Sequence, residues 1–202
     1  MDPKPDNRSK NVGEALYLVD LTYTQQGLQS EIMPNAIGCL ATYAKKTLGD
    51  TYAIQLFKRP ETLIAALEAG FPRVIGFSTY TWNYAISYSF AEAMKAACPE
   101  TVVVFGGPNY PNEPGEQERF LRSHPAVDFF VVKEGEIPFA RLLARLAETG
   151  FDLDADYDIA AVHYLDKRLD RAVLPPANDR IRDLSEIPSP YMAGLMDPYF
   201  ED

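Results

Sequence analysis

The chain of 202 residues has few side chains that ligate metals: its only cysteines are Cys39 and Cys98, and its only histidines are His124 and His163. Both cysteines lie within apolar helical patterns that are far apart in the sequence. We therefore expect two buried thiols in a reducing cytoplasm rather than a disulfide. Most metal centres and iron–sulfur clusters are therefore excluded, because such sites need several cysteine or histidine ligands close together.

Positive charge is also scarce, with 19 Lys and Arg against 29 Asp and Glu, for a net charge of −10 at pH 7. Proteins that bind nucleic acids need clustered basic residues, so we expect no nucleic-acid partner. No apolar run approaches the roughly 20 residues of a membrane span, and we expect no membrane partner. Residues 1–13 are polar and unlike a signal peptide; we expect a disordered N-terminus on a cytoplasmic protein.

The remaining sequence alternates between strand and helix patterns. Short apolar runs predict strands at 15–20, 52–57, 73–78, 101–105 and 128–132. Helical spacing predicts helices at 35–48, 60–70, 83–97, 116–123 and 137–148. Several strands are apolar throughout, as expected when helices cover both faces of a sheet. The pattern predicts an α/β fold: a Rossmann-like (flavodoxin-like), doubly wound parallel sheet of five strands in the order 2-1-3-4-5.

The last quarter of the chain has a different character. Residues 159–165 and 169–174 predict a β-hairpin, and from Pro175 onward the sequence is rich in proline, aspartate and single spaced hydrophobic residues. Such a tail cannot bury much by itself but suits draping over a surface. We divide the chain into a polar N-terminus at 1–13, a Rossmann-like domain at 14–150, a hairpin extension at 151–176 and a linker at 177–202.

Ligands of an open parallel sheet bind outside the carboxyl ends of the strands. There the sequence places an unusually long loop after the first strand, hydroxyl and aromatic residues from Ser78 to Trp82, the pair Gly106–Gly107, and Glu134-Gly-Glu136. Each alone has a simpler interpretation, such as a turn, a helix start, a helix cap or packing. Together they predict one site for a large ligand.

Familiar small-ligand sites do not match these loops. The first loop has a single glycine, Gly27, so the dinucleotide motif is absent, and there is no Gly-Lys-Ser/Thr phosphate loop. A phosphate-accepting receiver needs an aspartate at the end of strand three, where Ser78 stands, although Asp20 and Lys133 fit superficially. No nucleophile is placed beside a base, and His124 and His163 are interpreted as surface or packing residues. The sequence thus predicts binding rather than catalysis.

Three segments resemble a known family. Val74-Ile-Gly-Phe-Ser-Thr79, Val103-Val-Phe-Gly-Gly-Pro-Asn109 and Phe130-Val-Val-Lys-Glu-Gly-Glu136 resemble the amino-terminal cobalamin-binding domain of cobalamin-dependent radical SAM enzymes. Residues 183–191 resemble the segment that joins that domain to the radical SAM barrel. The likeness covers roughly residues 14 to 202. It implies that cobalamin lies across the carboxyl ends of the strands, with its dimethylbenzimidazole tail threaded between sheet and helix.

The resemblance also implies roles for individual residues. Ser78 and Thr79 would hydrogen-bond around the buried tail, and Gly106 and Gly107 would leave room for it, so that Ser78→Leu or Gly107→Val would fill the pocket. The nucleotide loop would be lined by Pro108, Asn109, Glu134, Gly135 and Glu136. The corrin ring would be approached by the loop from Tyr23 to Asn35, which includes Thr24 and Gln25, and by Tyr80 and Trp82.

Two departures from related cobalamin proteins shape the expected function. In the methionine synthase and mutase branch, Asp-x-His-x-x-Gly supplies a histidine to cobalt. The matching frame here is Met33-Pro-Asn-Ala-Ile-Gly38, with Asn35 in the place of that histidine. An amide is a poor cobalt ligand beside imidazole, so we expect cobalamin bound base-off and without a protein ligand to cobalt.

The second departure is the absence of a Cys-x-x-x-Cys-x-x-Cys run. A 4Fe-4S cluster and S-adenosylmethionine would belong only to a longer parent chain. We expect a piece of a longer enzyme rather than a free-standing carrier: a module that holds methylcobalamin or hydroxocobalamin for a radical SAM domain in cis, in a parent that is a methyltransferase. The alternative is a non-catalytic flavodoxin-like domain that binds another ligand or a partner and no cobalamin.

Overall fold

The computed structural model describes residues 13–23, 32–177 and 180–200. Seven strands are formed there: β1 (Glu14–Val19), β2 (Tyr52–Phe57), β3 (Val74–Ser78), β4 (Val102–Gly106), β5 (Phe129–Val131), β6 (Val162–Asp166) and β7 (Arg171–Val173). The helices are α1 (Asn35–Leu48), α2 (Pro60–Ala69), α3 (Tyr84–Ala97), α4 (Pro114–Ser123) and α5 (Glu136–Glu148). Each element that the sequence pattern predicts is present, with ends shifted by a few residues at most.

All the strands belong to one sheet, in the order β2-β1-β3-β4-β5-β6-β7. The first five are parallel, and the switch point lies between β1 and β3, because β1 pairs with β2 on one side and with β3 on the other. The flavodoxin-like order 2-1-3-4-5 is therefore confirmed. This order brings the carboxyl ends of β1, β3, β4 and β5 to one edge of the sheet.

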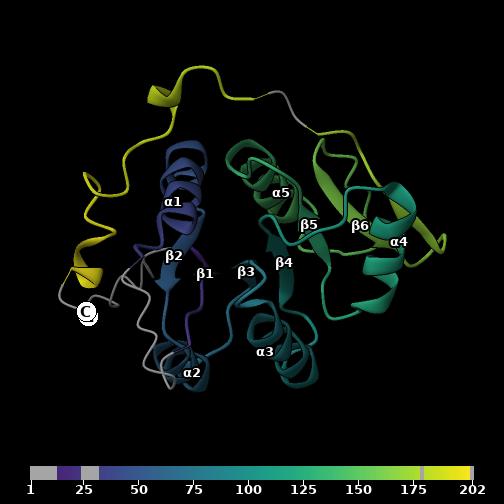
Figure 1. Ribbon diagram of the computed structural model, residues 1–202, viewed down its shortest axis with the longest axis horizontal. Coiled ribbons are helices and arrows are strands. Elements are labelled where there is room, and N and C mark those ends of the chain that lie inside the picture. The colour runs from purple at the N-terminus through teal and green to yellow at the C-terminus, as the bar shows by residue number, and fades with distance from the viewer. Residues whose placement is uncertain (1–12, 24–31, 178–179, 201–202) are drawn as a thin grey trace, which may run out of the picture.

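Helices cover both faces of this sheet (Figure 1). Helices α1 and α5 lie side by side on one face, over a core that includes Leu16, Val104 and Leu142. Helices α2 and α3 lie on the other, over a core that includes Val19, Ile75 and Phe105. Alternate residues of one strand thus enter different cores, which explains why the strands are apolar throughout.

The predicted hairpin continues the main sheet. Strand β6 pairs antiparallel with β5, placing His163 opposite Phe130, and β7 pairs antiparallel with β6. The hairpin strand begins at Val162, later than expected, because Ala161 takes a left-handed backbone conformation with φ of 64°. The extension is thereby fixed to the domain by backbone hydrogen bonds rather than by a flexible joint.

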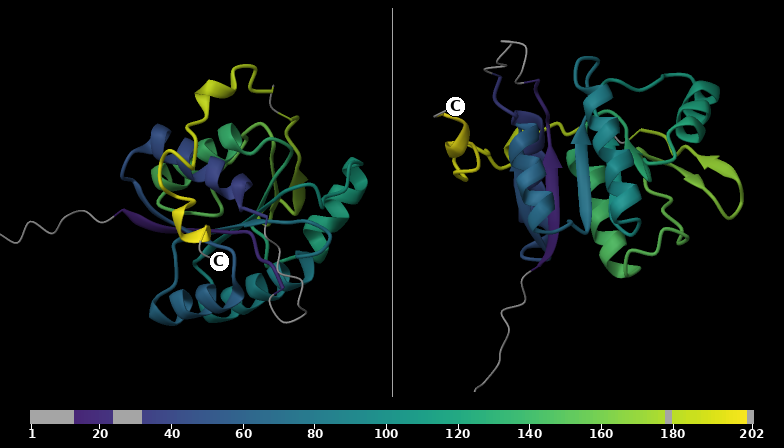
Figure 2. Two further views of the ribbon diagram at one scale, coloured as in Figure 1. Left: turned by 60° about the vertical axis from the view of Figure 1, so that its left-hand side comes forward. Right: turned by 90° about the horizontal axis from the view of Figure 1, so that it is seen from below.

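The C-terminal tail crosses from the hairpin side of the molecule to the side of β2, passing over α1 (Figures 1 and 2). Among residues 180–200, the tail forms two short 3₁₀ segments, Leu184–Glu186 and Asp197–Tyr199. Thr42 of α1 donates a hydrogen bond to the Pro188 carbonyl at 2.7 Å, and the side chain of Met196 is fully buried. The spaced hydrophobic residues of the tail therefore anchor it to a helix surface.

Both cysteines are free and only half-buried, which corrects the expectation of two buried thiols. Cys39 lies on the flank of α1, and Cys98 caps the end of α3, so neither points fully into a core. Partial burial raises the pKa of the Cys39 thiol, with the Glu136 carboxylate adding to that effect. Among the helices that the structure describes, none is long and apolar enough to cross a membrane.

Candidate functional site: a cavity at the carboxyl edge

A cavity of about 1080 Å³ lies at the carboxyl edge of the sheet. It is lined by the ends of β3, β4 and β5, the first turns of α1 and α5, and the loops that follow the strands. Ligand pockets in proteins usually measure about 300–1,000 Å³, so this cavity suits a large ligand. Three of the four loops that the sequence predicts to converge on one rim, those after β3, β4 and β5, contribute residues to this cavity.

A closely packed glycine, Gly76, lies on the floor of the cavity. Gly76 stands in the middle of β3, where a Cβ atom would lie 3.0 Å from Leu18 Cδ2 and 3.5 Å from Phe139 Cζ. Leu18, Gly76 and Phe139 all line the cavity, so a side chain at position 76 would occupy cavity space. The cavity thus extends down the sheet face that α1 and α5 cover, and an elongated group can enter between sheet and helices.

The cavity brings together half of the residues that the sequence analysis assigned to a site. The following predicted residues line it: Ser78, Tyr80, Gly106, Gly107, Pro108, Glu134, Gly135 and Glu136. They come from three different loops, and parallel topology brings these loops together. Their individual roles toward a ligand stay predictions.

Three other predicted residues support the rim without lining the cavity. Thr79 is fully buried, and its hydroxyl donates to the Gly106 carbonyl at 2.8 Å, which ties the β3 loop to the end of β4. Asn109 donates its backbone N–H to the Thr79 carbonyl at 3.4 Å. Trp82 is 60% exposed and stacks on Tyr80 with ring centroids 4.5 Å apart, so Trp82 lies one layer outside the cavity.

Two residues predicted to approach a ligand from the first loop do not line the cavity. Tyr23 and Asn35 are exposed, and neither is among its lining residues. Gly38 faces the C-terminal tail, because a Cβ atom there would lie 2.7 Å from Met196 Cε and 2.9 Å from Pro190 Cβ. Gly38 thus permits close packing of α1 and the tail. Thr24 and Gln25 lie outside the described residues.

The backbone itself requires a glycine at position 107. Its φ is 109°, and a Cβ atom would lie 2.5 Å from the Thr79 carbonyl oxygen. The expectation that Gly107→Val would fill the pocket is therefore wrong, because the new side chain would collide with the Thr79 backbone. Gly106 differs, since a Cβ there would meet nothing closer than 3.5 Å.

A fully buried asparagine organises the loop after β3. Asn83 donates to the Ser78 carbonyl at 3.1 Å and to Asp20 Oδ1 at 3.2 Å, and its Oδ1 accepts from the Tyr80 N–H at 2.8 Å. Burial raises the pKa of the Asp20 carboxyl to about 6, and the Lys58 ammonium only partly offsets that rise. The cavity rim therefore rests on a polar network that includes a carboxylate in an unfavourable environment.

Several cavity residues were missed by the sequence analysis. His163 and Tyr110 line one wall, Lys133 and Arg180 line the mouth, and Gly76 lines the floor. Arg180 forms an ion pair with Glu134 at 3.2 Å, which joins the tail to the loop before α5. Lys133 has a left-handed φ of 62°, a conformation that a lysine in the sequence does not predict. The positions of His163 and Arg180 depend on where the hairpin and the C-terminal tail return to the sheet, which the local sequence does not mark.

The comparisons with known proteins agree with this geometry. The sequence model of the B12 binding domain matches residues 28–143, which is more than half of the chain. The chain belongs to the B12 binding domain family. The matched residues include β3, β4, β5 and the first turns of α1 and α5, which form most of the cavity. The chain is therefore a cobalamin-binding domain, as the resemblance implied.

Two curated relatives extend beyond this domain. The chain is 32% identical over 190 residues to the cobalamin-dependent radical SAM methyltransferase TokK of Streptomyces tokunonensis, covering 92% of this chain and 26% of that protein. It is 34% identical over 173 residues to the 2-(S-pantetheinyl)-carbapenam-3-carboxylate methyltransferase of Streptantibioticus cattleyicolor, covering 82% of this chain and 24% of that protein. The chain thus spans about a quarter of the length of these relatives.

A solved structure confirms the fold. The cobalamin-dependent S-adenosylmethionine radical enzyme OxsB, with aqua-cobalamin and S-adenosylmethionine bound, superposes with a TM-score of 0.66. The sequence identity is 17%, and the match covers 93% of this chain and 25% of OxsB. That coverage includes most of the hairpin and tail as well as the parallel sheet.

Proposed function

We propose that this chain is the cofactor-holding module of a cobalamin-dependent radical SAM methyltransferase. The observation that carries the proposal is the cavity at the carboxyl edge, formed largely within the matched family residues. The two methyltransferase relatives support the choice of parent. When bound, cobalamin supplies a cobalt centre that can carry a methyl group. The radical SAM domain that would use it, with its cluster and S-adenosylmethionine, would lie outside these 202 residues in cis.

The residues present fit cobalamin in shape and charge. The cavity lining includes residues of β3 and β4 and of the facing helices α1 and α5, and Gly106 is not closely packed, which suits the dimethylbenzimidazole tail of cobalamin. The cavity lining carries Lys133 and Arg180 against Glu134 and Glu136, so its formal charges balance. A corrin with neutral amide arms and a single phosphodiester tolerates such a lining, whereas a ligand with several phosphates would need excess positive charge.

We further propose that cobalamin binds base-off and without a protein ligand to cobalt. Asn35 stands where a ligating histidine would be expected, and it is exposed in the first turn of α1. His163, the histidine in the cavity lining, already directs both ring nitrogens at protein atoms. Electron paramagnetic resonance of the Co(II) form tests this proposal. The expected spectrum lacks nitrogen superhyperfine splitting, and a resolved splitting would contradict it.

The binding test uses the full chain and hydroxocobalamin. The expected result is corrin absorbance that elutes with the protein on gel filtration and a spectrophotometric titration that saturates at one equivalent. Absence of both would favour the alternative of a flavodoxin-like domain with another ligand or partner.

The matched variants are Ser78→Leu and Ser89→Leu. Ser78 lines the cavity and is 8% exposed, whereas Ser89 lies on the exposed face of α3. A leucine at position 78 should fill cavity space and lower the affinity at least about tenfold, which corresponds to about 1.4 kcal/mol. Ser89→Leu should bind like the unmodified chain. Equal affinity in both variants would show that the ligand does not use this cavity.

A further inference from the structure

One wall of the cavity lies outside the residues that match the family model. The match ends at residue 143, yet the lining includes His163 of β6, Leu174 to Ala177 after β7, and Arg180. Antiparallel pairing with β5 brings this extension to the cavity. The site of this chain therefore extends beyond the residues that match the family model.

His163 has a defined protonation state in this wall. The side chain is buried, and its Nε2 lies 3.0 Å from the Pro175 carbonyl oxygen. A carbonyl oxygen can only accept a hydrogen bond, so Nε2 must carry a proton. Burial also lowers the pKa of His163, which keeps the imidazole neutral and leaves Nδ1 without a proton.

The unprotonated Nδ1 of His163 faces Tyr110. The phenol oxygen of Tyr110 lies 3.3 Å from Nδ1, and burial raises the pKa of Tyr110, so the phenol keeps its proton and donates it. The Tyr110 ring stacks on Phe130 with centroids 3.8 Å apart. The hydrogen-bond chain from Tyr110 through His163 to Pro175 thus ties the β4–α4 loop to the hairpin extension.

We propose that His163 is a positioning residue of the cobalamin site, and that the Tyr110 oxygen it orients accepts a hydrogen bond from an amide arm of the corrin. This proposal rests on the proposed function. A phenol that donates its proton to His163 keeps lone pairs directed elsewhere, and Tyr110 itself lines the cavity. Primary amide N–H groups are the donors that corrin side arms carry.

Two substitutions at His163 separate its two hydrogen bonds. Asparagine keeps an acceptor near the position of Nδ1, and glutamine keeps a donor near the position of Nε2. We expect His163→Gln and Tyr110→Phe to lower the affinity for hydroxocobalamin about three- to tenfold, the usual range for one lost hydrogen bond. His163→Asn should bind within about twofold of the unmodified chain, because Tyr110 keeps its partner.

The measurements are spectrophotometric titrations with hydroxocobalamin and with cobinamide, alongside thermal unfolding of each variant without ligand. Cobinamide keeps the amide arms and lacks the nucleotide tail, so Tyr110→Phe should lower both affinities by a similar factor. A loss confined to cobalamin would overturn the amide-arm assignment. The proposal would be overturned if His163→Gln and His163→Asn lost affinity equally and each loss of affinity paralleled the loss of thermal stability. His163 would then have a structural role only.

The two levels of the argument fail in different ways. If the unmodified chain binds no corrin, the proposed function is wrong, and the role of His163 falls with it. If the unmodified chain binds hydroxocobalamin, while His163→Gln and Tyr110→Phe bind it equally well, only the role of the extension is wrong.

Discussion

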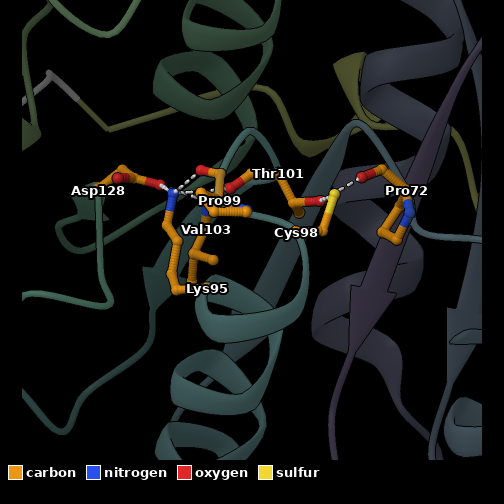
Figure 3. A network of polar contacts seen from close by, with 7 residues as sticks. All are labelled: Pro72, Lys95, Cys98, Pro99, Thr101, Val103 and Asp128. Atoms are coloured by element: carbon orange, nitrogen blue, oxygen red, sulfur yellow. Dashed lines mark hydrogen bonds and ion pairs between the residues drawn. The ribbon is translucent and has the colours of Figure 1, made fainter.

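The two edges of the sheet differ in how well their buried carboxylates are paired. At the amino edge, Asp128 is nearly fully buried, and its Oδ2 lies 2.6 Å from Lys95 Nζ and 2.8 Å from the Val103 N–H (Figure 3). At the carboxyl edge, Asp20 is also largely buried, and within the described part of the chain its carboxylate accepts from the Asn83 amide at 3.2 Å and has the Lys58 ammonium farther away.

The amino edge is a closed network. Lys95 also donates to the Thr101 carbonyl at 2.7 Å, and the Thr101 hydroxyl donates to the Pro72 carbonyl at 2.8 Å (Figure 3). These contacts join the segments that precede β3, β4 and β5. The carboxyl edge instead has long loops, glycines and a cavity. Paired polar groups stabilise the amino edge. The carboxyl edge leaves room for a ligand, and it contains residues with strained backbone and a desolvated carboxylate.

The largest expected effect comes from breaking the amino edge. Lys95→Met leaves Asp128 buried without its cation, which should lower the free energy of unfolding by about 3–5 kcal/mol. Urea denaturation measures the loss. The double variant Lys95→Met/Asp128→Asn removes the unpaired charge and should recover a large part of it. Equal stability of the single and double variants would show that the ion pair is not what holds this edge.

At the carboxyl edge, the two adjacent glycines should respond differently to a methyl group. Gly107→Ala places a Cβ against the Thr79 backbone in a left-handed conformation and should destabilise the fold by about 2–3 kcal/mol. Gly106→Ala is the matched control, because its Cβ would make only ordinary contacts. Thermal unfolding of both variants tests the difference. Comparable losses would contradict the structural role assigned to position 107.

The desolvated carboxylate should be a measurable weakness of the carboxyl edge. Because the pKa of Asp20 is raised to about 6, the folded state keeps a proton that the unfolded state releases. Stability from this group therefore falls as pH rises from about 4 to about 6. Asp20→Asn should raise the free energy of unfolding by about 1–2 kcal/mol at pH 7 and by almost nothing near pH 4.

Urea denaturation at the two pH values measures the Asp20 effect. The control Asp154→Asn alters an exposed carboxylate and should leave the free energy of unfolding nearly unchanged. A gain that is the same at both pH values would mean that desolvation of Asp20 is not its cause.

The smallest expected effect concerns Lys133, whose left-handed backbone is unfavourable for a residue with a Cβ. Lys133→Gly should stabilise the fold by about 0.5–1 kcal/mol, because relief of strain exceeds the entropy that glycine adds to the unfolded chain. Lys133→Ala removes the same charge but keeps the strain, so it should bring no gain in thermal unfolding. A gain in both would trace the effect to charge instead.

Sequence patterns identified most of the fold, and half of the residues that they assigned to a site line the cavity. Ser78, Gly106 and Glu136 could be placed together in advance because they follow parallel strands, and topology alone brings such positions to one edge. Gly38 was assigned by motif frame, and the structure places it against Met196 and Pro190 of the tail. His163 could not be recognised, because the register of an antiparallel hairpin is set by tertiary packing rather than by a local motif.

The scarcity of cysteine, histidine and positive charge, together with apolar strands alternating with amphipathic helices, determined the class of this protein: an acidic α/β domain that holds a ligand at the carboxyl edge. Those properties follow from the composition of the chain and from the spacing of hydrophobic residues along each strand and helix. Only the tertiary structure decided the outline of the site, because its floor at Gly76 and its wall at His163 depend on which elements meet. Burial in that arrangement also raised the pKa of Asp20 and lowered that of His163, since desolvation acts only once the chain has folded.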